Sequence, residues 1–198
     1  MYKPVTIPFD HSEKHFSLIA DFFDKCSVYG YKNTTSCKEI RLKELTPPHG
    51  NLWITLFKNK VEGIHGLQPL FDYKKNCYRV LTRNCVFPII NQITSPKGLT
   101  KNYLSRSYSL RIVLQYQLDW LSSRFENFIP ILTVNSPSKK DDSAGKSFAS
   151  YARIFPLLEK QGILTKLEKD YFLYNCEQDI YMLNTLSYYS ALKEIQEK

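Results

Sequence analysis

The stretch that decides the fold runs from residue 52 to residue 67 and reads LWITLFKNKVEGIHGL. Its first six residues predict a strand, and the Lys-Asn-Lys sequence at 58–60 predicts a tight turn. Residues 61–67 then continue as a second strand, which makes the whole stretch a β-hairpin. Gly63 and Gly66 on the second strand indicate a bulge or a close approach of the backbone.

Helices and further strands are expected on both sides of this hairpin. Before it, Asp10 and Glu13 form a capping box for a helix that stops near Gly30, and a strand follows at 38–45. After it, the periodicity predicts a strand at 77–87, an irregular stretch at 89–107, a helix at 108–124, a strand at 129–134, a helix at 148–160, a strand pair at 164–167 and 171–175, and a helix at 177–196. This order predicts an α/β (α+β) fold in which helices flank a mixed central sheet, with a helix at the C-terminus. We expect residues 1–176 to form one domain, with residues 177–198 as a helix packed on it or extending from it.

The predicted strand at 77–87 carries an unusual number of polar side chains. Strict alternation places one set on one face, namely Arg79, Leu81, Arg83 and Cys85. The other face then holds Tyr78, Val80, Thr82, Asn84 and Val86. Arginines on a central strand cost free energy unless they have partners or face a cleft, so this strand is a candidate wall of a site.

The net charge of +8 arises in a single window of the sequence. Residues 73–111 contain no Asp or Glu, whereas outside this window the 19 basic residues balance the 19 acidic ones. The eight basic residues of the window are Lys74, Lys75, Arg79, Arg83, Lys97, Lys101, Arg106 and Arg111. Such a window predicts a local positive field that suits a phosphate-bearing ligand or a nucleic acid, and the alternative is a solvated basic face without a ligand.

Composition narrows the class of protein further. The 198 residues, of which 43% are hydrophobic and 14% aromatic, are sufficient for a sizeable core in one domain. No apolar run approaches the ~18 residues that a membrane span requires, and the polar N-terminal residues carry no secretory signal. The five cysteines form no C-x-x-C pair, and His11 and His15 have no third ligand, so we expect reduced thiols and no metal. These features predict a cytoplasmic protein with no membrane contact.

Two further features suggest chemistry without defining it. His65 lies between Gly63 and Gly66, where a substrate could come close, so it is a candidate general base; an ordinary strand histidine is the alternative. Tyrosines and phenylalanines interleave with the basic residues of the window, a pattern that also suits single-stranded nucleic acid.

Three local patterns resemble the GNAT superfamily of acyl-CoA N-acyltransferases. The hairpin at 52–67 is similar to the second and third strands of that family, including their I-V-G-x-x-G-L ending. Residues 132–135, Leu-Thr-Val-Asn, resemble its fifth strand, and residues 158–163, Leu-Glu-Lys-Gln-Gly-Ile, resemble the end of its next helix. The strand at 77–81, Cys-Tyr-Arg-Val-Leu, is shared with GNAT-like proteins of tailed phages. The resemblance covers roughly residues 12–175, and for a phage-encoded protein it implies the cytoplasm of the host.

The resemblance implies a site for acyl-CoA. In the family the fourth and fifth strands diverge, acyl-CoA lies between them, and the following loop and helix receive the pyrophosphate. The residues that this implies around the phosphates are Arg83, Lys97, Gly98, Lys101, Ser105 and Arg106. Asn135 is implied beside the pantetheine arm, and Glu62 or His65 as the general base.

Two departures from the family pattern concern catalysis. No Q/R-x-x-G-x-G/A sequence occurs between residues 87 and 111, where only Gly98 is available. The family tyrosine that protonates the leaving thiolate corresponds to Leu158, so Tyr174, Tyr151, Tyr171 or water must supply the proton.

The resemblance therefore implies transfer of an acetyl group from acetyl-CoA to a primary amine of a small molecule or peptide, by direct attack. The alternatives are a catalytically inactive GNAT-shaped binding or virion-associated protein, and a basic nucleic-acid-binding module.

Overall fold

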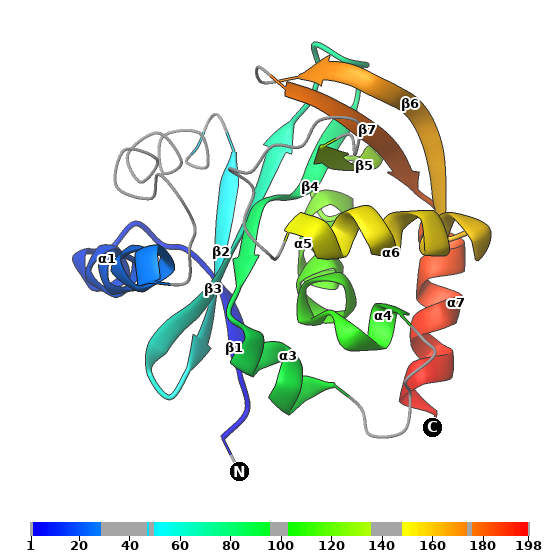
Figure 1. Cartoon of the computed structure of the whole chain (residues 1–198). Helices are drawn as coiled ribbons and strands as arrows, with labels where there is room; N and C mark the ends of the chain where they lie inside the picture. The colour runs from blue at the N-terminus through cyan, green and yellow to red at the C-terminus, as the bar shows by residue number, and fades with distance from the viewer. Residues whose placement is uncertain are drawn as a thin grey trace.

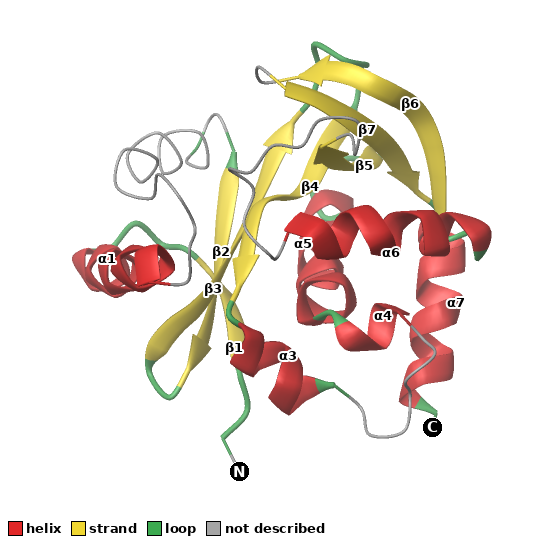
Figure 2. Ribbon diagram, viewed as in Figure 1, coloured by secondary structure: helices red, strands yellow, loops and turns green. Residues whose placement is uncertain are grey.

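A seven-stranded sheet forms the centre of the molecule, and helices cover both of its faces (Figure 1 and Figure 2). The computed structural model describes residues 2–28, 47, 50–95, 103–135, 148–173 and 176–197. The strands are β1 (Val5–Pro8), β2 (Asn51–Phe57), β3 (Lys60–Pro69), β4 (Cys77–Val86), β5 (Ile129–Asn135), β6 (Leu164–Leu173) and β7 (Cys176–Leu183). The helices are α1 (Glu13–Val28), α3 (Pro88–Thr94), α4 (Tyr103–Arg106), the π-helix η1 (Ser109–Val113), α5 (Leu114–Ser122), α6 (Phe148–Lys160) and α7 (Thr185–Gln196).

The strands lie in the order β1-β2-β3-β4-β5-β7-β6. Neighbouring strands are antiparallel, with the exception of β4 and β5, which are parallel. Helix α1 packs on one face, whereas η1, α5, α6 and α7 gather on the other (Figure 1). The predicted fold class, a mixed central sheet flanked by helices with a helix at the C-terminus, is confirmed.

The predicted hairpin is confirmed as β2 and β3, which pair from Asn51↔Leu67 to Phe57↔Lys60. Lys58 and Asn59 form its two-residue turn, and both adopt left-handed backbone, with φ of 52° and 60°. Two-residue turns of this hand match the twist of the strands that they join. The register shifts by one residue beyond Thr55, so the predicted irregularity near Gly63 is also confirmed.

Strand β4 departs from strict alternation through two bulges. The first bulge lies between the pairs Gln68↔Arg79 and Gly66↔Thr82, and the second lies between Gly66↔Thr82 and Ile64↔Cys85. In each bulge β4 has one more residue than β3. Leu81 has a φ of 49°, and its N–H donates to Oε1 of the buried Gln117 at 2.8 Å instead of pairing along the strand. The predicted alternation is therefore wrong at Leu81, which joins Val80 in the core, and at Thr82, which bonds Gln68 on the other face. The second bulge then returns Asn84 to the face that the sequence predicted.

The C-terminal segment contains more strand than the sequence predicted. β6 spans Leu164–Leu173 and β7 spans Cys176–Leu183, so the last helix begins at Thr185 and not at residue 177. β7 buries Ile180 on one face and Tyr181 on the other, and a strand buried on both faces lacks the alternation that identifies strands in a sequence.

Smaller elements were also missed or misplaced. β1 and α3 were not predicted, and the strand expected at 38–45 lies outside the described residues. Helix α1 is capped by Ser12, whose Oγ accepts the His15 N–H, while Asp10 accepts from the N–H of Ser12 in a turn ahead of the helix. Asp10 and Glu13 therefore do not form the predicted capping box.

The largest core cluster lies between the sheet and helices η1, α5, α6 and α7. Helix α7 contributes Tyr188, Leu192 and Ile195 to it, so the C-terminal helix shares this core with the sheet. A second cluster packs α1 against β2, β3 and β4, and a small third cluster lies on the same face near β5 and β7. None of the helices described here is both long and apolar enough to cross a membrane.

Candidate functional site

Strands β4 and β5 separate soon after they begin. They pair only at Cys77↔Ile129, Tyr78↔Pro130 and Arg79↔Ile131, although β4 continues to Val86 and β5 to Asn135. β5 keeps β7 as its antiparallel partner along Ile131 to Asn135, so the pairing is interrupted only on its β4 side. We call this divergence beyond Arg79 and Ile131 the splay (Figure 1). A splay leaves backbone donors and acceptors of both strands free of each other, which suits an extended ligand with amide groups.

A continuous path of side-chain hydrogen bonds runs beneath the helices and ends at Tyr151 of α6, which is bonded to the diverging half of β4. We call it the polar chain, and its members are Tyr108, Thr6, Thr55, His65, Asn84 and Tyr151. The successive distances are 3.0, 2.9, 2.7, 2.5 and 2.8 Å. The polar chain crosses β1, β2, β3 and β4, and it then reaches α6 through Tyr151. Polar groups at such depth are costly unless each finds a partner, and these partners come from five separate elements and from Tyr108, the N-cap residue of η1.

His65 is the central member of the polar chain and has no exposed surface. Its Nε2 lies 2.7 Å from Thr55 Oγ1 and its Nδ1 lies 2.5 Å from Asn84 Oδ1. Burial lowers the pKa of His65 to about 4, although the hydrogen bond to Asn84 acts in the opposite direction. The imidazole is therefore neutral at pH 7 with both nitrogens engaged. This placement suits a positioning role better than the role of a base, which must reach its substrate.

Glu62, the other candidate base, faces the opposite side of the sheet. Its carboxylate lies 3.3 Å from Nζ of Lys25 on α1, and its side chain retains 14% of its surface. Glu62 and His65 are thus neighbours in sequence that the structure places on different faces of β3. They do not form one catalytic group.

Among the residues expected near the phosphates, the structure places Ser105 and Arg106 in the short helix α4. Ser105 is buried and Arg106 is exposed. Arg83 lies on β4 and Asn135 at the end of β5, but their side chains are outside the described part of the structure. Lys97, Gly98, Lys101 and Tyr174 also lie outside the described residues.

The acid-free window does not form one compact surface among the residues that the structure describes. Lys74 and Lys75 lie in the turn before β4, whereas Arg106 and Arg111 come after α3, which follows the other end of β4. A strand of ten residues is about 33 Å long, so the two groups belong to separate regions of the molecule. Strand β4 thus extends through the middle of the window and separates these described basic residues, and a single local field from residues 73–111 stays a prediction.

Arg111 behaves differently from the exposed basic residues. Its Nη2 donates to the carbonyl oxygen of Thr94 at the end of α3, at 2.5 Å, and its Nε is buried without a hydrogen-bond partner. Burial lowers the pKa of this guanidinium. Arg111 thus joins η1 to α3, and the sequence offered no sign of this role beyond its charge.

Three described positions bear on the question of a proton donor. Leu158, which the resemblance aligned with a tyrosine, is buried in the main core and has no proton to give. Tyr171 packs edge-on against Tyr73 at the third cluster, on the other face of the sheet. Tyr151 bonds Asn84 on the diverging half of β4, and its hydroxyl also interacts with the side chains of Ser107 and Ser109. Burial raises the pKa of Tyr151, so its hydroxyl keeps its proton at neutral pH.

Sequence reasoning missed two members of this arrangement. Asn84 was assigned to a face of β4, but nothing local indicates that it bonds His65 on β3 and Tyr151 on α6. Thr55 looks like an ordinary strand threonine. The detectable signal was Gly63: a Cβ there would lie 3.1 Å from His65 Nε2, so glycine makes room for the ring.

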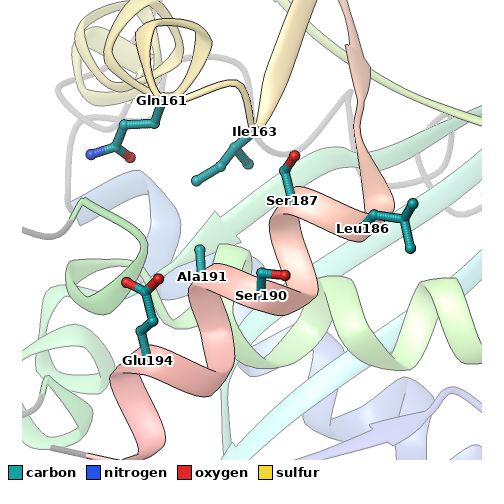
Figure 3. A pocket seen from close by; sticks show the side chains of 7 residues that line it. All are labelled: Gln161, Ile163, Leu186, Ser187, Ser190, Ala191 and Glu194. Carbon is teal, nitrogen blue, oxygen red and sulfur yellow. The ribbon is translucent and has the colours of Figure 1, made fainter.

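A separate open groove of about 550 Å³ lies between the end of α6 and the outer side of α7 (Figure 3). Its lining residues are Gln161, Ile163, Leu186, Ser187, Ser190, Ala191 and Glu194. None of these belongs to the polar chain or to the strands β4 and β5 that form the splay. Among the described residues, no group of three or more His, Cys, Asp and Glu side chains could hold a metal ion.

The sequence matches no protein-family model and no curated protein. Solved structures do share its fold. The aminoglycoside 6'-N-acetyltransferase from Enterococcus faecium is 14% identical with a TM-score of 0.56, over 90% of this chain and 94% of that one. An acetyltransferase from Streptococcus agalactiae is 15% identical with a TM-score of 0.54, over 91% and 97% of the two chains. A protein of the GNAT family from Desulfovibrio desulfuricans is 10% identical with a TM-score of 0.51, over 91% and 96% of the two chains.

These likenesses extend over almost the whole of each chain. At identities of 10 to 15% they show the fold, which is that of GNAT acetyltransferases.

Proposed function

We propose that this protein is an acyl-CoA-dependent N-acyltransferase that transfers an acetyl group to a primary amine by direct attack. The observation that carries the proposal is the splay, in which two parallel central strands pair over three residues and then diverge. A fully paired sheet would have no free backbone edge at its centre to accept an extended cofactor arm. Acetyl-CoA as the co-substrate would supply the thioester, and the residues of this chain bind it, position it and move protons.

Tyr151 is the proposed proton donor to the departing thiolate sulfur. It bonds Asn84 on the diverging half of β4 and belongs to α6, the helix that follows β5 in the chain. Its pKa is raised by burial, which keeps the hydroxyl protonated and able to donate. Leu158 cannot serve this purpose, and Tyr174 stays an alternative that lies outside the described residues.

Glu62 is the proposed general base, because its carboxylate is partly exposed and His65 is sealed from solvent. The base removes a proton from the incoming ammonium group so that the free amine attacks. The Lys25 ammonium lies 3.3 Å from a carboxylate oxygen of Glu62, and this ion pair holds the carboxylate in place on the sheet.

The phosphates of the cofactor are proposed to lie near the segment after β4. Arg106 and Ser105 in α4 belong to this region, and Arg83, Lys97, Gly98 and Lys101 are proposed as additional contacts, with Asn135 beside the pantetheine arm. The acceptor is proposed to be a small-molecule or peptide amine. In support, one of the proteins that share the fold is an aminoglycoside 6'-N-acetyltransferase.

The proposal is tested by thermal unfolding with and without acetyl-CoA and desulfo-CoA. A ligand at ~100 times its dissociation constant stabilises the protein by about 2.7 kcal/mol, which corresponds to a rise in Tm of about 5–10 °C. Arg106→Glu should abolish the shift. Lys74→Glu is the matched control, because it removes the same charge from the same window beyond the far end of β4, and it should leave the shift unchanged.

Each outcome has a defined meaning. A wild-type protein that shows no shift at millimolar ligand does not bind CoA, and the proposal then fails in favour of a non-catalytic scaffold of the same shape. Loss of the shift in both variants would show that binding depends on net charge and not on this site. A shift without thiol release in an amine screen would indicate binding without turnover.

A further inference from the structure

The Asn84 amide determines which group donates in each hydrogen bond of the polar chain. Asn84 Nδ2 donates to the Tyr151 hydroxyl oxygen at 2.8 Å. The other end of the same amide, Oδ1, has no hydrogen and can only accept, so the proton in its 2.5 Å contact with His65 must come from Nδ1 of the ring. His65 is therefore protonated on Nδ1.

This assignment determines the remaining bonds. A neutral imidazole with its proton on Nδ1 has a lone pair on Nε2, so Nε2 accepts the hydroxyl proton of Thr55 at 2.7 Å. Thr55 in turn accepts from Thr6, and Thr6 accepts from Tyr108. Each hydroxyl then donates once along the path, and every buried group in it is satisfied. The whole polar chain points from Tyr108 toward His65 and, through Asn84, toward Tyr151.

The backbone around His65 is shaped to keep the ring in this position. Gly63 lies on the same face of β3, and a Cβ there would come within 3.1 Å of His65 Nε2, 3.2 Å of Val86 Cγ2 and 3.3 Å of the Cys85 carbonyl oxygen. The absent Cβ leaves the space in which Thr55 meets Nε2. The second bulge of β4 brings Asn84 onto the same face from the other side.

The direction of the hydrogen bonds in the polar chain determines which acceptors the Tyr151 hydroxyl can donate to. Its oxygen already receives the N–H of Asn84, so its own hydrogen cannot point at Asn84 and must be offered to another acceptor. The side chains of Ser107 and Ser109 lie beside the hydroxyl. Rotation about the C–O bond is the movement that would turn this hydrogen from the two serines toward another acceptor.

We propose that His65 is a positioning residue: its Nδ1–H holds the Asn84 amide in the orientation that makes Tyr151 a hydrogen-bond donor toward the splay. The proposal rests on the proposed function in one respect, namely that the acceptor in the splay is the sulfur leaving from acetyl-CoA. The protons of His65 itself take no part in the reaction. A merely structural polar chain would satisfy the same buried groups without setting the donor direction of Tyr151.

The first test reverses the hydrogen bond between residue 84 and the Tyr151 hydroxyl. In Asn84→Asp the new carboxylate accepts from both His65 Nδ1–H and the Tyr151 hydroxyl, so the tyrosine proton is drawn away from the splay. We expect kcat for thiol release from acetyl-CoA, with the amine that wild type acetylates fastest, to fall by about a hundredfold with KM for acetyl-CoA unchanged. Tyr151→Phe should show a loss of the same size.

A double-mutant cycle separates this role from a structural one. If Asn84 acts through Tyr151, then adding Asn84→Asp to Tyr151→Phe lowers kcat no further. Losses that multiply in the double variant would overturn the proposal, because Asn84 would then act independently of the tyrosine. Unfolding midpoints of all four proteins show whether each variant is folded at the assay temperature.

A measurement that needs no turnover tests which nitrogen of His65 carries the proton. The ¹⁵N shifts of the His65 ring distinguish the two neutral tautomers, and we expect the proton on Nδ1 in wild type and in Tyr151→Phe. A proton on Nε2 would overturn the proposal whatever the activity. His65→Asn keeps an N–H donor toward Asn84 and should retain more kcat than His65→Leu, which has none; equal losses would count against the positioning role.

The two possible failures are distinguishable. Absence of any thiol release by wild type, with His65 protonated on Nδ1, removes the proposed function and leaves the orientation intact. Normal turnover in Asn84→Asp removes the inference and leaves the proposed function intact.

Discussion

At the scale of single residues, burial decides what His65 does. An exposed histidine titrates near 6.5 and can exchange protons with a substrate. His65 has no exposed surface, and its ring contacts Thr55 and Asn84 through hydrogen bonds at both nitrogens. The pKa of about 4 follows from the free-energy cost of a charge in that environment. The same side chain is therefore unsuited to being a base and well suited to fixing the orientation of a neighbour.

This burial predicts a particular dependence of stability on pH. The pKa of His65 is about 4 in the folded protein and 6.5 in the unfolded chain, so the unfolded chain binds the proton more tightly. The contribution of neutral His65 to stability is thus complete above pH 6.5 and is lost as the pH falls toward 4. Between pH 7 and pH 4.5 the loss is about 2–3 kcal/mol. Tyr108 and Tyr151, which belong to the same polar chain, stay neutral over this range.

Urea unfolding of wild type and His65→Gln at the two pH values checks this prediction. Wild type should lose about 2–3 kcal/mol more than the variant, because the carboxylates of the protein contribute equally to both. If both proteins lose the same free energy, His65 is not held neutral by the fold.

At the scale of elements, the two bulges of β4 and helix α5 depend on each other. The first bulge turns the Leu81 N–H away from β3, and Gln117 of α5 accepts it at 2.8 Å. Gln117 Nε2 donates to the Gly66 carbonyl oxygen of β3 at 3.0 Å, so a single side chain satisfies a backbone group on each strand. A buried helix residue thereby stabilises an irregular strand. The bulges in turn place Asn84 beside His65.

Gln117→Leu should therefore be costly, although leucine has a similar volume. It leaves the Leu81 N–H and the Gly66 carbonyl buried without partners, at about 1–3 kcal/mol for each group. We expect unfolding free energy to fall by about 2–5 kcal/mol and amide exchange at Leu81 to accelerate. Gln161→Leu, at an exposed position directly after α6, is the control and should change stability by less than about 0.5 kcal/mol. If Gln117→Leu leaves the free energy of unfolding unchanged, water has replaced the amide as the hydrogen-bond partner of the two backbone groups.

At the scale of the whole molecule, the C-terminal helix is bound into the main core. Tyr188, Leu192 and Ile195 of α7 are buried, and the Tyr188 hydroxyl donates to the Leu110 carbonyl of η1 at 2.6 Å. The helix thus contacts the same helices that cover the polar chain. We expect its loss to affect the sheet and not only the C-terminal segment.

Leu192→Ala tests this coupling. Leucine-to-alanine changes in a core cost about 2–5 kcal/mol, and one cooperative transition should shift as a whole when followed by both far-UV circular dichroism and tryptophan fluorescence. Leu186→Ala is the matched control on the same helix, because Leu186 is 82% exposed, and it should leave the midpoint almost unchanged. Two separate transitions in Leu192→Ala would show that α7 unfolds independently of the sheet.

The features that the sequence predicted well are those that depend on residues close together in the chain. The β2–β3 hairpin follows from a two-residue turn and the strands beside it, and the helices predicted at 108–124 and 148–160, which are η1 with α5 and α6, follow from their apolar periodicity. The mixed fold is a consequence of the order of these elements. For the candidate site, Gly63 beside His65 was the informative local signal, because an absent Cβ is visible in a sequence.

By itself, then, the sequence determined the hairpin, the mixed α/β order and the acid-free basic window at residues 73–111, since each depends on local composition and spacing. Only the tertiary structure decided that β4 divides the window of basic residues, that residues 177–183 form strand β7 and not the start of the last helix, and that His65 is a neutral link between Thr55 and Asn84. The physical reason is that burial and hydrogen bonding join residues up to 102 positions apart, such as Thr6 and Tyr108. No local pattern records which distant groups will meet.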